Sequence, residues 1–324
     1  MRTSLKFAVA ALCTTLVISA QSGRADEPGL STDMQSKIDH LPADLVKAID
    51  PALPTAPVVK PAKPRKLLVY MESKGYYHDS IPICGLVLKK LGEKTGAWTA
   101  TITDDPAVWT PETLAKYDAV FMDNTVTENP KTPEARKALL DYVKAGHGFG
   151  GSHAGADCNH SWDEYFELIG GEFGGHPWGH VSVKNEDPKN PINAAFDGQG
   201  FVIDEEIYTY KMVTANRPQA YSRDKLHILY SVDLEKSGYK DTTRTDGDYG
   251  LAWIHKYGEG HVFYTALGHN QKVFVNPILL KHFLAGIQYS LGDLEADATP
   301  TAKMSPAPTV VPGPDKGAKT INVQ

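Results

Sequence analysis

The feature that most constrains the fold is an alternation of short apolar runs with amphipathic segments. Three runs have the length and composition of buried strands: residues 66–71 (KLLVYM), 98–103 and 119–122. Helical spacing follows at residues 81–94 and 133–145, with proline at the start of the second helix and Gly146 after its end. This order predicts an α/β fold with three layers, in which helices cover both faces of a mostly parallel sheet.

The second half of the chain is less regular but continues the same domain. Its candidate strands are residues 181–183, 203–210, 227–232, 251–255 and 261–266, followed by a helix at 277–291. We therefore expect one domain over residues 65–295, a length that suits a single large core.

Both ends of the chain differ in composition from this domain. Residues 1–25 combine Arg2 and Lys6 with an apolar run and small residues at its end, the pattern of a signal peptide. Residues 26–64 contain a short amphipathic segment and a proline-rich linker. Residues 296–324 are rich in alanine, proline and threonine and are predicted to form a disordered tail. The mature chain is thus expected in the periplasm or outside the cell.

Charge and cysteine content exclude several classes of function. The formal net charge is −6, and removing residues 1–25 takes away three basic residues and no acids, which gives −9. An acidic chain without a basic stripe is not expected to bind nucleic acid or a membrane surface. We also expect no nucleotide cofactor. Cys84 and Cys158 remain after export; they form either one disulfide or two buried free thiols.

Chemistry-bearing residues gather at residues 148–180, in a glycine-lined stretch with four histidines and two tryptophans. Within it, GSHAG (residues 151–155) lies between a predicted strand and a helix, which is the local form of a nucleophile elbow with His153 at its apex. A second interpretation makes Ser152 the nucleophile of an esterase, with Glu205 and His269 as its partners. The glycine that this motif needs after the serine is missing.

The helix, glycine, strand and sharp turn resemble the class I glutamine amidotransferase fold, which is flavodoxin-like. That family has cysteine at the apex, so the resemblance combined with His153 argues against the amidotransferase reaction. A more specific resemblance is to the ThuA-like (trehalose utilisation) family. Its blocks are YYHDSI (76–81), GSHAGAD (151–157), GGEF with HP (170–177), DEEIY (204–208) and YGEGHVFYTALGH (257–269). The chain departs from the family at His261 and Tyr77, where arginine is expected.

The resemblance and the predicted topology place histidines from separate segments at one edge of the sheet. In open α/β sheets ligands bind at the carboxyl ends of the strands. Imidazole and carboxylate groups there are suitable ligands for one divalent ion, Zn, Mn or Fe. The candidate ligands are His78, His153, His176 and His269. Without a tight metal-binding spacing, the same histidines are equally suited to acid/base catalysis or to supporting a polar pocket.

Further residues complete the predicted site. The candidate catalytic residues are His153, His78, Asp157 and Glu205, with Asp157 expected to orient His153. The sequence does not decide whether Glu205 or Glu206 faces the site, because neighbours in a strand point to opposite faces. The candidate substrate-binding residues are Trp178, Tyr77, Tyr208 and His180, since aromatic rings suit the faces of sugars.

The leading hypothesis is an exported enzyme of carbohydrate catabolism, acting on a glycoside or a keto-sugar by histidine and carboxylate chemistry, with or without a metal. The resemblance implies the carbohydrate partner. Two alternatives stay open: a non-catalytic sugar-binding or scaffold protein on an amidotransferase-like fold, and the Ser152 esterase. The sequence does not define the oligomeric state.

Overall fold

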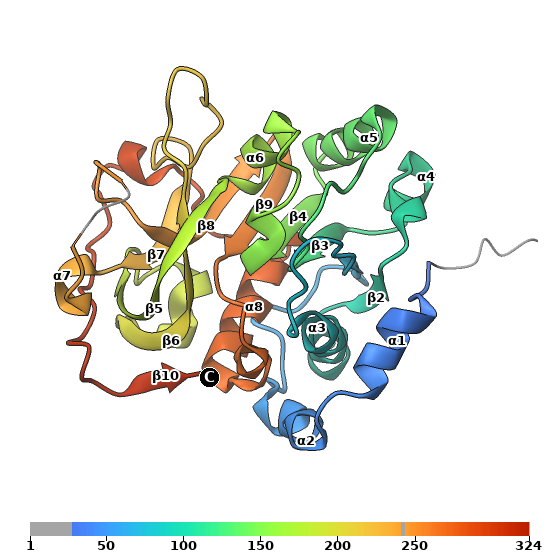
Figure 1. Cartoon of the computed structure of the whole chain (residues 1–324), viewed down its shortest axis with the longest axis horizontal. Helices are drawn as coiled ribbons and strands as arrows, with labels where there is room; N and C mark the ends of the chain where they lie inside the picture. The colour runs from blue at the N-terminus through green and yellow to red at the C-terminus, as the bar shows by residue number, and fades with distance from the viewer. Residues whose placement is uncertain (1–27, 241–243, 324) are drawn as a thin grey trace, which may run out of the picture.

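The computed structural model describes residues 28–240 and 244–323, and the sheet in this part has ten strands (Figure 1). Their order across the sheet is β10-β6-β5-β7-β8-β9-β4-β3-β1-β2. The strands are β1 (Lys66–Tyr70), β2 (Thr99–Thr103), β3 (Ala119–Asp123), β4 (Gly148–Ser152), β5 (Phe173–Asn185), β6 (Phe201–Tyr210), β7 (His227–Val232), β8 (Gly250–Tyr257), β9 (Gly260–Thr265) and β10 (Thr320–Asn322).

The sheet is mixed. The half that contains β2, β1, β3, β4 and β9 is parallel, as the alternation of strands and helices predicts. From β9 through β8, β7 and β5 to β6 every pairing is antiparallel, and only the edge pair β6–β10 is parallel again. The α/β class is therefore confirmed, and the antiparallel half explains why the described connections from β5 to β9 contain only short helical turns, such as Leu234–Ser237.

Helices cover both faces of the sheet. They are α1 (Thr32–Asp39), α2 (Ala43–Ala52), α3 (Ile81–Thr95), α4 (Pro111–Leu114), α5 (Pro133–Lys144), α6 (Asp163–Ile169), α7 (Leu234–Ser237) and α8 (Pro277–Ser290). In β9, Phe263 packs against α8, whereas its neighbour Tyr264 stacks on Trp253, which bonds to the end of α6. Since neighbouring side chains in a strand face opposite ways, α8 and α6 lie on opposite faces. No helix in the described ranges is long and apolar enough to cross a membrane.

The segments outside the predicted domain are part of the folded core. Met34 in α1 and Ile49 in α2 are buried, and the backbone of Val58 and Val59 donates to Gln288 of α8. The prediction of a disordered tail at residues 296–324 is wrong for the described part, because β10 pairs with the edge of β6 and satisfies its backbone groups. The signal peptide predicted at residues 1–25 lies outside the described residues.

The curvature of the sheet brings distant strands together. Three strands separate β6 from β9 in the sheet order, yet Tyr210 of β6 bonds to Tyr264 of β9 through the two hydroxyl groups, 3.0 Å apart. The rings of Tyr210 and Trp253 also meet edge to face, 4.9 Å between centroids. Strong twist in the antiparallel half thus places β6 over the carboxyl ends of the central parallel strands.

Candidate functional site

The elbow predicted at GSHAG is present. Strand β4 ends at Ser152, and the 3-10 helix η2 (His153–Ala156) begins at once with His153 at φ +43°. Small residues are needed around this turn: a Cβ on Gly151 would meet Ile169 Cδ1 at 3.2 Å, and a Cβ on Gly268 would lie 3.4 Å from the Cβ of His153. The turn therefore holds a buried histidine where a nucleophile elbow holds its nucleophile.

Four side chains from four segments meet at this elbow: His78 after β1, His153 after β4, Glu206 in β6 and His269 after β9. Each offers a ligand atom, and these atoms lie within 4.8 Å of one another. The histidine rings pack edge to face, with centroids 4.8 Å apart for His78 and His153 and 5.3 Å apart for His78 and His269. We call these four residues the histidine–glutamate cluster. It confirms that His78, His153 and His269 converge at the carboxyl edge of the parallel strands.

The orientation of His153 is fixed by its neighbours. Its Nδ1 lies 2.9 Å from the carbonyl oxygen of Ala266, and because a carbonyl only accepts, Nδ1 carries the proton and donates. The ring lies 4.0 Å from that of Tyr208, centroid to centroid. Nε2 then presents a lone pair toward Oε1 of Glu206, 3.4 Å away. Two acceptors facing each other need a proton or a cation between them.

Within the cluster, the environment favours neutral imidazoles at His78 and His269 beside an ionised carboxylate at Glu206. Burial, with His153 and His269 close by, lowers the pKa of His78 to about 3. Burial also lowers the pKa of His269. Burial alone would raise the pKa of Glu206, but its contacts with His153 and His269 outweigh this and lower it. At neutral pH these groups are in the protonation states that metal ligands require.

The residues of the cluster fit a divalent metal. Three imidazoles and one carboxylate are a donor set suited to Zn, Mn or Fe. His78 Nδ1, His153 Nε2 and His269 Nδ1 are buried nitrogens without a hydrogen-bond partner in the described residues. Ligands about 2.1 Å from a tetrahedral ion lie roughly 3.4 Å from one another, so the cluster would need to contract slightly.

Glu205 is not a member of the cluster but accepts hydrogen bonds from the loop that carries His269. Its side chain is fully buried, and Oε1 accepts from the backbone N–H groups of His269 (2.6 Å) and Asn270 (3.2 Å), while Oε2 accepts from the Asn270 side chain (2.8 Å). Burial raises its pKa. The structure thus assigns Glu206 to the cluster, and Glu205 holds the loop that carries His269.

Asn124 is a second supporting residue, and the sequence reasoning missed it. It is buried at φ +47° after β3, and its side-chain amide donates to Ser80 Oγ and to the carbonyl oxygen of Gly268, each at 3.0 Å. Its side-chain oxygen accepts from the backbone of Ala154 at 3.3 Å. One side chain therefore links the three loops that carry His78, His153 and His269. The only sequence signal was its place directly after a buried strand, beside the acidic residue that ends it.

Two surface hollows flank the cluster and share His269 and Asn270. One, of about 510 Å³, lies along His176, Trp178 and Glu206. The other, of about 380 Å³, lies along Tyr76, Tyr77, His78 and Val323. Both volumes fall in the lower half of the range of about 300–1,000 Å³ that small-molecule sites occupy. The cluster is thus reachable from two sides.

Some predicted site residues lie at the edge of the cluster. His176 is half exposed, and its Nδ1 lies 3.4 Å from Oε2 of Glu206, so it contacts the cluster from outside. Tyr208 packs on His153. Tyr77 lines the smaller hollow, with the ammonium group of Lys37 4.1 Å from its ring centroid. Trp178 borders the larger hollow, but its ring stacks on Tyr239, so most of it is packing surface.

Two predicted roles are not supported by the geometry. Asp157 bonds to His160 (3.1 Å), and the group that orients His153 is the Ala266 carbonyl. His180 bonds to Asp204 and to the backbone carbonyl of Lys316, so it holds the C-terminal segment instead of lining a hollow. His180 is close to the site in sequence, but β5 continues through it and pairs it with Asp204 of β6.

The remaining nucleophile candidates are buried. Ser152 is fully buried, and its hydroxyl donates to no histidine in the described residues, which removes the geometric basis of the esterase interpretation. Cys84 and Cys158 are buried free thiols, not a disulfide. Burial raises the pKa of Cys158 to about 12 and that of Cys84 well above its usual value.

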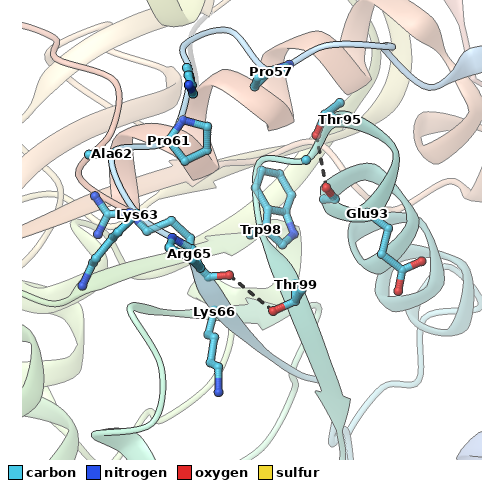
Figure 2. A pocket seen from close by; sticks show the side chains of 14 residues that line it. Pro57, Pro61, Ala62, Lys63, Arg65, Lys66, Glu93, Thr95, Trp98 and Thr99 are labelled. Carbon is cyan, nitrogen blue, oxygen red and sulfur yellow. Dashed lines mark hydrogen bonds between the residues drawn. The ribbon is translucent and has the colours of Figure 1, made fainter.

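A larger hollow lies at the opposite edge of the sheet (Figure 2). It has a volume of about 650 Å³ and is bordered by Lys63, Arg65, Glu93 and Trp98 at the amino ends of β1 and β2. Arg65 is already paired with Asp293 (2.7 Å). This hollow holds no histidine and no cluster of acids, so its size alone does not make it a site of chemistry.

Comparison with known proteins supports the fold. The sequence pattern of the ThuA family, described as trehalose utilisation, matches residues 66–290. A ThuA-like protein from Bacteroides uniformis aligns with a TM-score of 0.54 at 20% identity, covering 71% of this chain and 93% of that protein. A ThuA-like protein from Parabacteroides merdae aligns with a TM-score of 0.51 at 18% identity, covering 72% and 93%. No match was found among curated proteins.

Proposed function

This chain belongs to the ThuA (trehalose utilisation) family, and from that premise we propose that it is an exported enzyme of carbohydrate catabolism. Its substrate would be a glycoside or a keto-sugar, and its chemistry would be proton transfer by histidine and carboxylate groups assisted by one divalent ion. The observation that carries the proposal is the histidine–glutamate cluster, in which three buried imidazole nitrogens have no hydrogen-bond partner among the described residues and lie beside an ionised carboxylate.

The chain's own residues have distinct tasks in this proposal. His78, His153, His269 and Glu206 would hold the ion, which when bound polarises an oxygen of the ligand or lowers the pKa of a bound water to about 7. His176 contacts Glu206 from the more exposed side, where it can receive or supply a proton at Nδ1. Glu205 and Asn124 keep His269 and the elbow in place.

The ligand would occupy the hollows on either side of His269. The smaller hollow offers Tyr77 and Asp79, and the larger one offers Trp178 and Asn270. Such a mixture of aromatic rings with hydrogen-bonding groups suits the two faces of a sugar ring and its hydroxyls.

Metal analysis of the purified mature chain, followed by turnover assays on glycosides and keto-sugars, tests the proposal. We expect about one equivalent of Zn, Mn or Fe in the unaltered protein, lost together with turnover in His153→Ala and Glu206→Gln. His160→Ala is the matched control, because His160 belongs to the same turn but bonds to Asp157 instead of the cluster. Retained metal and turnover in both cluster variants would contradict the assignment.

The sugar-binding alternative predicts a different outcome from the same preparation. Its supporting observation is that the elbow holds His153 and Ser152 is inaccessible, so the turn presents no nucleophile. Thermal stabilisation by a sugar without turnover and without metal would assign the chain to this alternative.

A further inference from the structure

The smaller hollow beside the cluster has a wall that comes from the far end of the chain. Val323 lines it together with His78 and His269, although more than fifty residues separate it from His269. Val323 is 1% exposed. Among the described residues that border this hollow, Val323 is the aliphatic one, and the others are polar, charged or aromatic.

Backbone pairing fixes the position of this wall. Strand β10 runs parallel to β6, with Asn322 opposite Asp204, so Val323 follows at the level of Glu205. Glu205 in turn bonds to the His269 loop. The wall is therefore tied to the strand that supplies Glu206 and to the residue that positions His269. In Figure 1, β10 lies below β6, close to the C-terminal end of the chain.

A separate set of contacts anchors the C-terminal segment before it reaches the hollow. Val311 and Asn185 exchange two backbone hydrogen bonds, of 2.9 and 3.0 Å. The carbonyl oxygen of Pro314 accepts from Ser182, and that of Lys316 accepts from His180 at 3.1 Å. Removal of the last residues would leave these anchors intact. The last strand can thus be deleted without releasing the rest of the segment.

The wall lies outside the part of the chain that the family shares. The family pattern ends at residue 290, whereas the wall is at residue 323. The cluster and the elbow lie within the matched residues, whereas the smaller hollow is also bordered by residue 323. A segment that borders the hollow without contributing to the cluster can change which ligands fit while the reacting groups stay the same.

We propose that the C-terminal strand and Val323 form a fixed wall that closes the smaller hollow and limits the ligand there to about one sugar ring. That the ligand is a sugar rests on the proposed function. The limit on the size of the ligand rests on the dimensions of the smaller hollow. The volume of about 380 Å³ lies near the lower end for small-molecule sites, which begins at about 300 Å³.

The first test needs no substrate. Diethyl pyrocarbonate acylates accessible imidazoles, and peptide mass spectrometry gives the rate at each histidine. In the deletion of residues 320–324 and in Val323→Ala, we expect the rate at His269 to rise several-fold relative to the unaltered protein. The exposed His40 is an internal reference that should not change. Val310→Ala is the matched control, because Val310 lies in the same segment but is 41% exposed and borders no part of the hollow.

The second test uses glucose, trehalose and their keto derivatives as probes, with binding measured by calorimetry. If the wall limits size, the deletion gains several-fold affinity for the disaccharides relative to the monosaccharides, and Val310→Ala does not. An unchanged labelling rate at His269 overturns the proposal, and so does an unchanged ratio of affinities. Faster labelling with no binding of any sugar by either protein supports the wall and counts against the carbohydrate function instead.

Discussion

Glu205 and Glu206 are adjacent in β6, yet the structure gives them different roles. Alanine substitutions at the two positions should therefore impair different properties of the protein. Glu205 is fully buried and accepts hydrogen bonds from the loop that carries His269. Glu206 is partly exposed and faces imidazole nitrogens that have no hydrogen-bond partner within the described part of the chain. Loss of Glu205 should reduce stability, whereas loss of Glu206 should reduce metal binding and turnover.

The expected magnitudes follow from the hydrogen bonds. Glu205→Ala leaves three well-placed donors without an acceptor: His269 N, Asn270 N and the Asn270 side chain. At about 1 kcal/mol or more for each buried donor, the free energy of unfolding should fall by about 3 kcal/mol. Each kcal/mol corresponds to about 2–4 °C in Tm for a domain of this size, so Tm should fall by roughly 6–12 °C. Glu206→Ala should change the free energy of unfolding by less than about 1 kcal/mol.

Urea denaturation and metal analysis on the same preparations measure both effects. Measurements should use metal-depleted protein for stability, because a bound ion stabilises the folded state by itself. If Glu205→Ala unfolds at the same urea concentration as the unaltered protein, or if Glu206→Ala is the less stable of the two, the assignment of the two carboxylates is wrong.

Two further predictions concern Gly268, which lies beside the cluster, and His282, which is buried in α8. Gly268 has φ +143° and lies against His153. Gly268→Ala should therefore lower the free energy of unfolding by about 1–3 kcal/mol and weaken metal binding, which thermal unfolding and metal analysis would measure. An unchanged Tm would refute the need for glycine at this position. Burial lowers the pKa of His282 to about 4, below the value near 6.5 expected in the unfolded chain. The stability that neutral His282 contributes is therefore complete above pH 6.5. It falls by about 1.4 kcal/mol per pH unit as the pH drops toward 4. Urea unfolding at several pH values should show a shallower slope over this range in His282→Gln, and an equal slope would contradict the assignment.

The parallel half of the fold and the core of the site could be predicted from the sequence. Buried strands alternating with helices leave few topologies, and the carboxyl ends of parallel strands share one edge. His78, His153 and His269 each follow such a strand, so their convergence followed from topology alone. The resemblance to the ThuA-like family, read from its ordered blocks, is likewise confirmed.

The parts that depend on the antiparallel half could not be predicted. Alternation along β6 shows that Glu205 and Glu206 point to opposite faces, but only the curl of the sheet decides which face meets the elbow. His180 has the same spacing from His176 as a ligand pair, yet its strand turns it toward Lys316. The C-terminal segment has too few apolar residues for a strand pattern, and its order comes from an edge that other strands create.

The strained backbone at His153 allows the cost of its conformation to be measured separately from the role of its imidazole in metal binding. A non-glycine residue at φ +43° is uncommon, and the left-handed region costs about 1–2 kcal/mol for residues other than glycine. His153 is held there because its carbonyl oxygen accepts from Tyr264 at 2.6 Å, its Nδ1 donates to Ala266, and its ring packs on Tyr208.

His153→Ala and His153→Gly both lose the imidazole, so neither should bind the metal, but only glycine relieves the backbone. We therefore expect the glycine variant to be more stable than the alanine variant by about 1 kcal/mol, despite the greater entropy of glycine in the unfolded chain. Urea denaturation of the two variants, free of metal, gives the difference directly. A more stable alanine variant would mean that the turn is not strained, and that His153 is at the apex for its side chain alone.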